Sequence, residues 1–221
     1  MRRFQRPHTL PFLLAAAGLV LYILIHPNNT CADWFEKWGQ LHGERWWSKI
    51  HQIGSLAFAA AAVGALRLPS LRLNFGRELL VAGFAVYCMV LPIHSSSVSF
   101  LGQAAHKDGV DLPTRSVLRT TGEAFVVYDE YMTGISLLLV AGGGVLLCLF
   151  GLARGGGVWG GRPLRLVLAF ISILPSAQYW SVPVLRSLLR GEDGRLWTFV
   201  VWFILLALVE PRRETDEGAA G

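Results

Sequence analysis

Charged residues are scarce in this 221-residue chain. Asp, Glu, Lys and Arg together make up 16% of the sequence, whereas 53% is hydrophobic, and the mean hydropathy is +0.45. A soluble globular domain carries about 25% charged residues. The composition therefore excludes an ordinary soluble domain and predicts an integral membrane protein.

Short catalytic motifs are also missing. The sequence contains no GxSxG, no HExxH and no Walker-type phosphate loop, and no HxxxH pair that could chelate a metal from one face of a helix. It has only three cysteines, too few for a disulfide framework. No reaction class can therefore be assigned from a motif.

Apolar stretches separated by charged residues dominate what is present. A helix needs about 20 apolar residues to cross the hydrocarbon core of a bilayer. We predict an all-α, polytopic membrane protein with six transmembrane helices in a single domain (residues 1–211), the first a retained signal anchor, and a disordered cytoplasmic tail at 212–221. The predicted spans are residues 9–25, 50–66, 78–94, 132–152, 166–185 and 196–210.

Basic residues indicate the orientation of these spans. Arginines gather in the segments that six spans would place on one side, and cytoplasmic loops carry an excess of Lys and Arg. We expect both termini in the cytoplasm, in a bacterial inner membrane. The net charge of +5 is scattered between apolar segments and does not form one basic face, so no nucleic-acid partner is expected. The expected partners are the lipid bilayer and other subunits of a membrane complex.

Two segments outside the spans have amphipathic character. Residues 30–50 place tryptophans at helical spacing, and residues 117–132 lead into the fourth span. Amphipathic helices of this kind lie in the membrane interface. We expect both on the extracytoplasmic side, with the tryptophans forming an aromatic belt.

Histidines are distributed unevenly. Under this topology five of the six lie on the outer side, and His26, His51 and His94 fall at the outer ends of three consecutive helices. Three imidazoles at one depth could ligate a transition metal, and two from facing helices could hold a b-type haem. They could equally be interface residues that contact lipid headgroups, and the sequence leaves the cofactor open.

Other polar residues are expected at the same depth. We predict that Tyr87, Gln178, Tyr179 and Trp47 line a ligand site, and that Glu123 or Asp129 would serve as a general base if the protein is an enzyme. Tyr87 could instead be a buried core residue, and Asp129 could simply face solvent.

The leading functional hypothesis is a small accessory or binding subunit whose outer, histidine-rich cavity holds a lipid-like or quinone-like molecule or a metal cofactor. A second hypothesis is a metal- or haem-dependent membrane enzyme acting on a lipid-soluble substrate. A third is a small-solute permease. The sequence does not decide between them.

Overall fold

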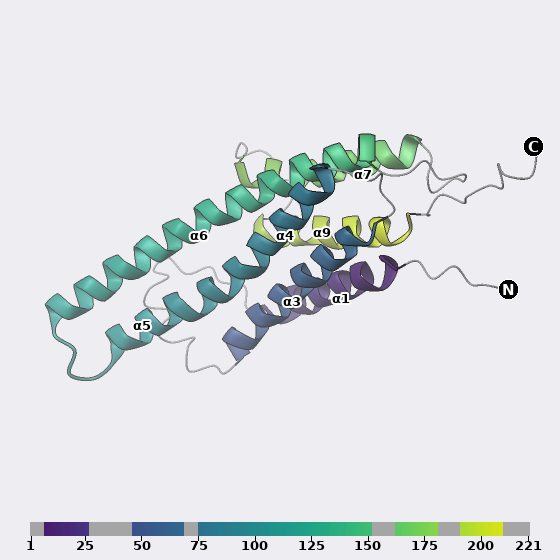
Figure 1. Ribbon diagram of the computed structural model, residues 1–221. Helices are drawn as coiled ribbons and strands as arrows, with labels where there is room; N and C mark the ends of the chain where they lie inside the picture. Colours follow the sequence, from purple (N-terminus) through teal and green to yellow (C-terminus); the bar gives the residue numbers. More distant parts are fainter. Residues whose placement is uncertain (1–6, 27–45, 69–74, 152–161, 181–190, 210–221) are drawn as a thin grey trace, which may run out of the picture.

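The computed structural model describes residues 7–26, 46–68, 75–151, 162–180 and 191–209. These parts of the chain form helices joined by turns, with no strand among them, which confirms the all-α prediction. The long helices in Figure 1 are α1 (Thr9–Ile25), α3 (Trp46–Leu66), α4 (Phe75–Ile93), α6 (Leu112–Leu146), α7 (Arg162–Trp180) and α9 (Gly191–Ala207). The shorter elements are α5 (Ser99–His106) and two π-helical turns, His94–Val98 and Leu147–Gly151.

The six long helices pack in chain order, and α9 closes the ring by packing against α1. Successive helices run in opposite directions. For example, Gly64 near the end of α3 lies against Phe12 near the start of α1, while Gly54 in the first half of α3 lies against Tyr22 near the end of α1. The architecture is therefore an up-and-down helical bundle.

Hydrogen bonds join the start of α1 to the end of α9. The buried His8 places Nε2 2.9 Å from the Val209 carbonyl, and the Thr9 hydroxyl donates to the Ala207 carbonyl at 3.0 Å. We call this end of the bundle, which carries His8 and Val209, the terminal end. The opposite end is called the far end.

A long helical hairpin extends past the far end, as Figure 1 shows. On one side α4 continues through the first π turn into α5, and on the other α6 runs for 35 residues. At 1.5 Å per residue α6 is about 52 Å long, against about 26 Å for the 17-residue α1. The helix expected over 117–132 is present, but it belongs to α6 and is not a separate element.

Pro92 does not interrupt the helical course of the chain at the end of α4. Pro92 lies inside the helix, and the chain widens into the π turn directly after it. The hydroxyls of Ser95 and Ser96 both donate to the Pro92 carbonyl, so side chains satisfy this acceptor where the regular helical pattern changes. The helix can therefore run on into α5.

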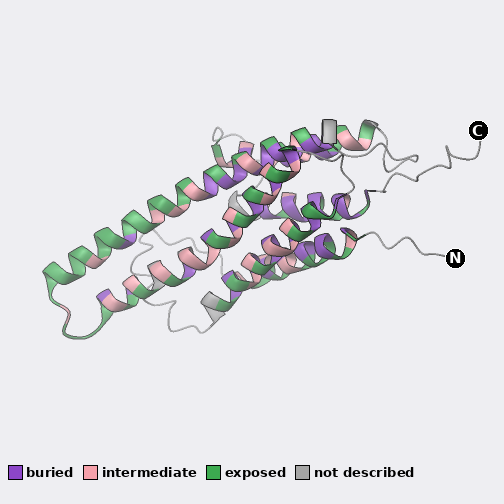
Figure 2. Ribbon diagram, in the orientation of Figure 1, coloured by how far each residue is buried: buried purple, intermediate pink, exposed green. Residues whose placement is uncertain are grey.

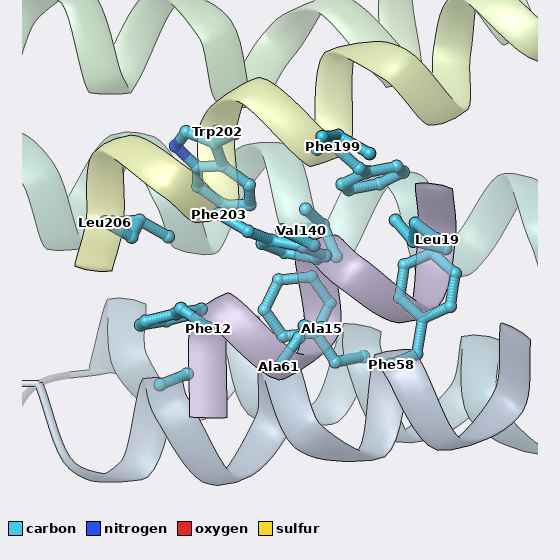
Figure 3. Close-up of a cluster of buried hydrophobic side chains, with 14 of the residues drawn as sticks. Phe12, Ala15, Leu19, Phe58, Ala61, Val140, Phe199, Trp202, Phe203 and Leu206 are labelled. Carbon is cyan, nitrogen blue, oxygen red and sulfur yellow. The ribbon is translucent and has the colours of Figure 1, made fainter. Parts of the chain in front are cut away.

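Aromatic side chains fill the centre of the bundle (Figure 3). Phe58 of α3 stands edge-on to Phe199 of α9, with ring centroids 5.3 Å apart, and Phe12 of α1 stacks on Phe203. These four residues are fully buried. Because edge-to-face and offset pairs add to the free energy of apolar burial, they hold α1, α3 and α9 together.

Glycines allow the backbones of α4 and α6 to approach closely. A Cβ added at Gly143 would lie 2.5 Å from the Leu80 backbone nitrogen, and one at Gly83 would lie 2.9 Å from the Ser136 carbonyl oxygen. The Ser136 hydroxyl donates to the Gly83 carbonyl at 2.8 Å. Small residues and interhelical hydrogen bonds of this kind join helices in lipid, where apolar burial alone gives little net gain.

Three helical stretches are long and apolar enough to cross a membrane: Lys49–Leu66, Phe75–His106 and Leu112–Leu149. The apolar helices Thr9–Ile25 and Gly194–Ala207 are shorter. Many large apolar side chains lie exposed on the outside of the bundle, as lipid-facing residues would. The findings thus support a membrane location. The amphipathic segment expected before Trp46, residues 181–185 of the fifth expected span and the expected tail lie outside the described residues.

Candidate functional site

Two groups of polar and aromatic residues lie at the far end of the bundle. The histidine pair is His26, at the end of α1, and His51, in the first part of α3. The second group, which we call the far-end polar cluster, is contributed by α6, α7 and α9. It consists of Asp129, Glu130, Tyr179 and Arg195.

The histidine pair is part of a small cluster of aromatic rings at the ends of α1 and α3. The rings of His26 and His51 have centroids 5.3 Å apart, and Tyr22, one turn before His26, contacts both at 4.9 and 5.6 Å. His51 is 1% exposed, whereas His26 caps α1 and is partly exposed. The structure therefore brings two of the three predicted metal-ligating histidines together and adds a tyrosine that the sequence analysis did not single out.

The expected set of three histidines is incomplete in the described part of the chain. His94 begins the first π turn and Trp47 lies in the first turn of α3, but the positions of their side chains are not described. Among the described residues, no group of three or more His, Cys, Asp or Glu side chains is arranged to hold a metal ion. The pair alone supplies two of the four ligands typical of a zinc site.

Tyr179 is the centre of the far-end polar cluster. Its hydroxyl donates to the backbone carbonyl of Glu130 on α6, and the guanidinium carbon of Arg195 on α9 lies 5.4 Å from its ring centroid. Asp129 and Tyr87 are also close enough to act electrostatically on the Tyr179 hydroxyl. Tyr179 of α7 thus interacts with polar groups of three other helices, α4, α6 and α9.

Tyr87 links this cluster to the aromatic core. It is 4% exposed and stacks on Phe58, with ring centroids 4.2 Å apart. It also contacts Phe199 edge-on at 6.1 Å. The structure therefore places Tyr87 both in the core and within electrostatic range of Tyr179. Tyr87 thus lies between the aromatic core and the far-end polar cluster.

Gln178 is buried without a hydrogen bond. The residue is 5% exposed, and neither Nε2 nor Oε1 has a hydrogen-bond partner. A buried polar group left unsatisfied costs about 1–3 kcal/mol. Such groups are rare in native structures.

The two candidate general bases occupy different environments. Asp129 is partly buried beside Tyr179. Glu123 lies on the projecting half of α6, where its carboxylate is half exposed and pairs with Arg119 at 3.1 Å. Of the two, only Asp129 belongs to the far-end polar cluster.

Arg195 is the member of the cluster that sequence reasoning missed. In the sequence it is a charged residue at the edge of the sixth apolar stretch, which indicates a boundary and not a site. Its role depends on α7 and α9 being antiparallel neighbours, and the hydropathy pattern does not contain that information. The signal available was its place at the same expected depth as Tyr179.

Comparison with known proteins gives no relative: no family model, no curated protein and no solved structure matches the chain. The functional interpretation therefore depends on the geometry.

Proposed function

We propose that the chain is a six-span membrane protein with the far end on the extracytoplasmic side and both termini in the cytoplasm. The alternating helix directions support this topology, since residues 8 and 209 meet at the terminal end. Arg67, Arg77 and Arg165 of the described residues belong to helix ends at that same end, as the excess of positive charge in cytoplasmic loops requires.

Single cysteines test the topology in a variant that lacks the three native ones. Arg67→Cys at the terminal end is expected to resist a membrane-impermeant maleimide added to intact cells. Asp108→Cys, in the hairpin turn, is expected to react. The reverse pattern would invert the orientation and place the cluster in the cytoplasm.

We further propose that the protein is a binding subunit that holds a lipid-soluble organic molecule at the far-end polar cluster. One observation supports this most strongly, namely that polar side chains from three helices converge on Tyr179 at one end of a bundle whose centre is filled by aromatic rings. Polar and ionisable groups within membrane helices are expensive and usually serve a function.

The experiment is an analysis of what the purified protein carries. We expect an organic molecule extracted near one equivalent per chain, and we expect Arg195→Met to reduce its occupancy while the protein stays monodisperse. A stable preparation with no bound organic molecule, from cells and after incubation with lipid extract, would contradict the proposal.

A second candidate function has one specific observation in its favour. The contact between the His26 and His51 rings supports it, since two neighbouring imidazoles could bind one transition metal ion, and such a membrane enzyme would use Asp129 as its base. An absorption spectrum with elemental analysis tests this reading. Metal or haem that is present in the purified protein and is lost in His51→Ala would favour the enzyme over the binding subunit.

The third hypothesis, a small-solute permease, has no feature of the described residues in its favour. Between the far-end polar cluster and the terminal end, buried aromatic rings such as Phe58, Phe199 and Phe203 fill the centre of the bundle, where a permease would need a polar path.

A further inference from the structure

Pro92 removes one hydrogen bond from α4, and another helix replaces it. Proline has no N–H, so the carbonyl of Cys88, four residues earlier, lacks its usual helical donor. The Ser55 hydroxyl of α3 donates to this carbonyl at 2.6 Å. Backbone groups that a proline frees within lipid need such partners. A side chain of α3 therefore stabilises the turn of α4 that contains the proline.

The chain changes its neighbours directly after this turn. Before it, α4 packs against both α3 and α6, and the π turn His94–Val98 still contacts both helices. After it, α5 packs mainly against α6. Prolines and π turns are the places where helices bend sharply. Pro92 and the π turn thus separate a firmly packed helix from one with fewer neighbours.

Little apolar surface holds α5 against α6. The buried residues of α5 within the described chain are Gly102 and Ala105, both small, whereas Phe100 is 65% exposed. Near the hairpin turn, Nε of Arg115 donates to the Ala105 carbonyl at 2.9 Å. Segments with few buried apolar contacts open at a low cost in free energy. We therefore expect α5 to separate from α6 more readily than the long helices separate from one another.

The turn that contains Pro92 lies beside the far-end polar cluster. The Ser136 hydroxyl of α6 donates to the Gly83 carbonyl of α4. Because these two helices run antiparallel, the stretch of α4 that continues to Pro92 ends level with the turn of α6 that carries Asp129 and Glu130. A movement at this turn therefore takes place at the depth of the cluster.

We propose that α5 is a hinged cover at the far end of the bundle. Pro92 and the π turn form the pivot, and the hydrogen bond from Ser55 to the Cys88 carbonyl holds α5 in its position against α6. When this bond is lost, α4 bends more freely at the pivot and α5 moves away from α6, which changes how the cluster is covered beside α4. The inference does not depend on the ligand that the cluster binds.

Spin labels on the full-length protein in nanodiscs test the hinge by pulsed EPR distance measurement. The labels are attached to an introduced keto amino acid, so that the native cysteines stay in place. The pair Gln103 and Ala124 reports the separation of α5 from α6, and the pair Lys49 and Ala124 reports that of α3 from α6; all three positions are exposed. Ser55→Ala is expected to add a longer distance to the first pair and to leave the second pair unchanged.

Two further variants separate a hinge from a general loosening of the bundle. Ser136→Ala removes an interhelical hydrogen bond away from the pivot, and both label pairs are expected to keep their wild-type distances. Pro92→Ala restores a backbone N–H that can donate to the Cys88 carbonyl. Adding Ser55→Ala to Pro92→Ala is therefore expected to have no effect on the separation of α5 from α6.

Three results would overturn the proposal. In the first, Ser55→Ala leaves the Gln103 and Ala124 pair at its wild-type distance. In the second, both label pairs change together, or Ser136→Ala acts as Ser55→Ala does, which would show that the hydroxyl stabilises the bundle as a whole. In the third, the effect of Ser55→Ala persists in the Pro92→Ala background, so that the hydroxyl does not replace the donor that proline lacks. None of these results bears on whether the far-end polar cluster binds a ligand.

Discussion

At the scale of single residues, the glycine run 142–144 shows how differently neighbouring positions behave. Gly143 and Gly144 both face other helices, and a Cβ on Gly144 would lie 2.5 Å from the Ser172 side chain. Gly142 is exposed, and a Cβ there would meet nothing within 4 Å. The run therefore serves packing at two of its three positions.

Gly143→Ala is expected to destabilise the protein by about 1–3 kcal/mol, because the added methyl group meets backbone atoms of α4 that cannot move aside. Gly142→Ala is the matched control and is expected to be neutral or slightly stabilising, since alanine favours the helix. Thermal unfolding in detergent measures both. Equal stabilities for the two variants would contradict the packing described for α4 and α6.

His8 provides a second prediction at this scale. His8→Ala leaves the buried Val209 carbonyl without the imidazole, and we expect a loss of about 1–3 kcal/mol in the free energy of unfolding. Leu10→Ala, a neighbouring change on the exposed face of α1, is expected to cost much less. If the two cost the same, the hydrogen bond between α1 and α9 does not contribute to stability.

At the scale of elements, the projecting hairpin carries an exposed apolar stripe. On α6 the stripe includes Val117, Tyr128 and Tyr131, and it continues into Ile135 and Leu138 of the spanning half. Figure 2 shows how exposed the outer part of this helix is. Because α6 is one continuous helix, its outer half cannot lie flat in the membrane interface, and the stripe predicts instead that a tilted α6 keeps this face against lipid.

Nitroxide labels can test this arrangement in bilayers. Labels at Val117 and Tyr128 are expected to be accessible to oxygen and protected from a water-soluble nickel complex. Labels at Arg119 and Glu123, whose side chains pair on another face of the same turns, are expected to show the reverse. Equal access to the nickel complex on both faces would place the hairpin in water.

The start of α6 depends on a helix cap that responds to pH. The Asp111 carboxylate accepts from the Thr114 backbone N–H at 2.8 Å, and hydrogen bonding from Thr114 lowers the Asp111 pKa. The stabilisation is therefore present above the ordinary aspartate pKa and is lost as the pH falls through the lowered value. Hydrogen exchange at the Thr114 amide is expected to accelerate over that range, and Asp111→Asn is expected to remove this pH dependence while retaining a cap.

The sequence predicts the elements better than their limits. Apolar stretches identify the helices, but the predicted fourth span begins at residue 132, whereas α6 begins at Leu112. The limit of an apolar stretch does not mark the end of a helix, because a helix continues wherever its backbone bonds are satisfied. The hydropathy pattern therefore does not predict the length of the hairpin.

At the scale of the whole molecule, the closed ring of antiparallel helices determines which residues meet. The contact between His26 and His51 follows from two consecutive antiparallel helices, so their expected common depth was enough to predict it. The gathering of Arg195 and Glu130 around Tyr179 requires knowledge of which helices are neighbours, and only the three-dimensional packing supplies it. The sequence thus predicts how far along each helix the candidate residues lie, but it does not predict which residues of other helices they contact.

The most direct test of the account is a native mass spectrum of the protein released from its own membranes. The account predicts a chain that carries one organic molecule of the lipid-soluble class, retained in Gly142→Ala and largely lost in Arg195→Met. A bare chain in every preparation, or a bound molecule whose occupancy does not change in Arg195→Met, would contradict the claim that the far-end polar cluster is a binding site.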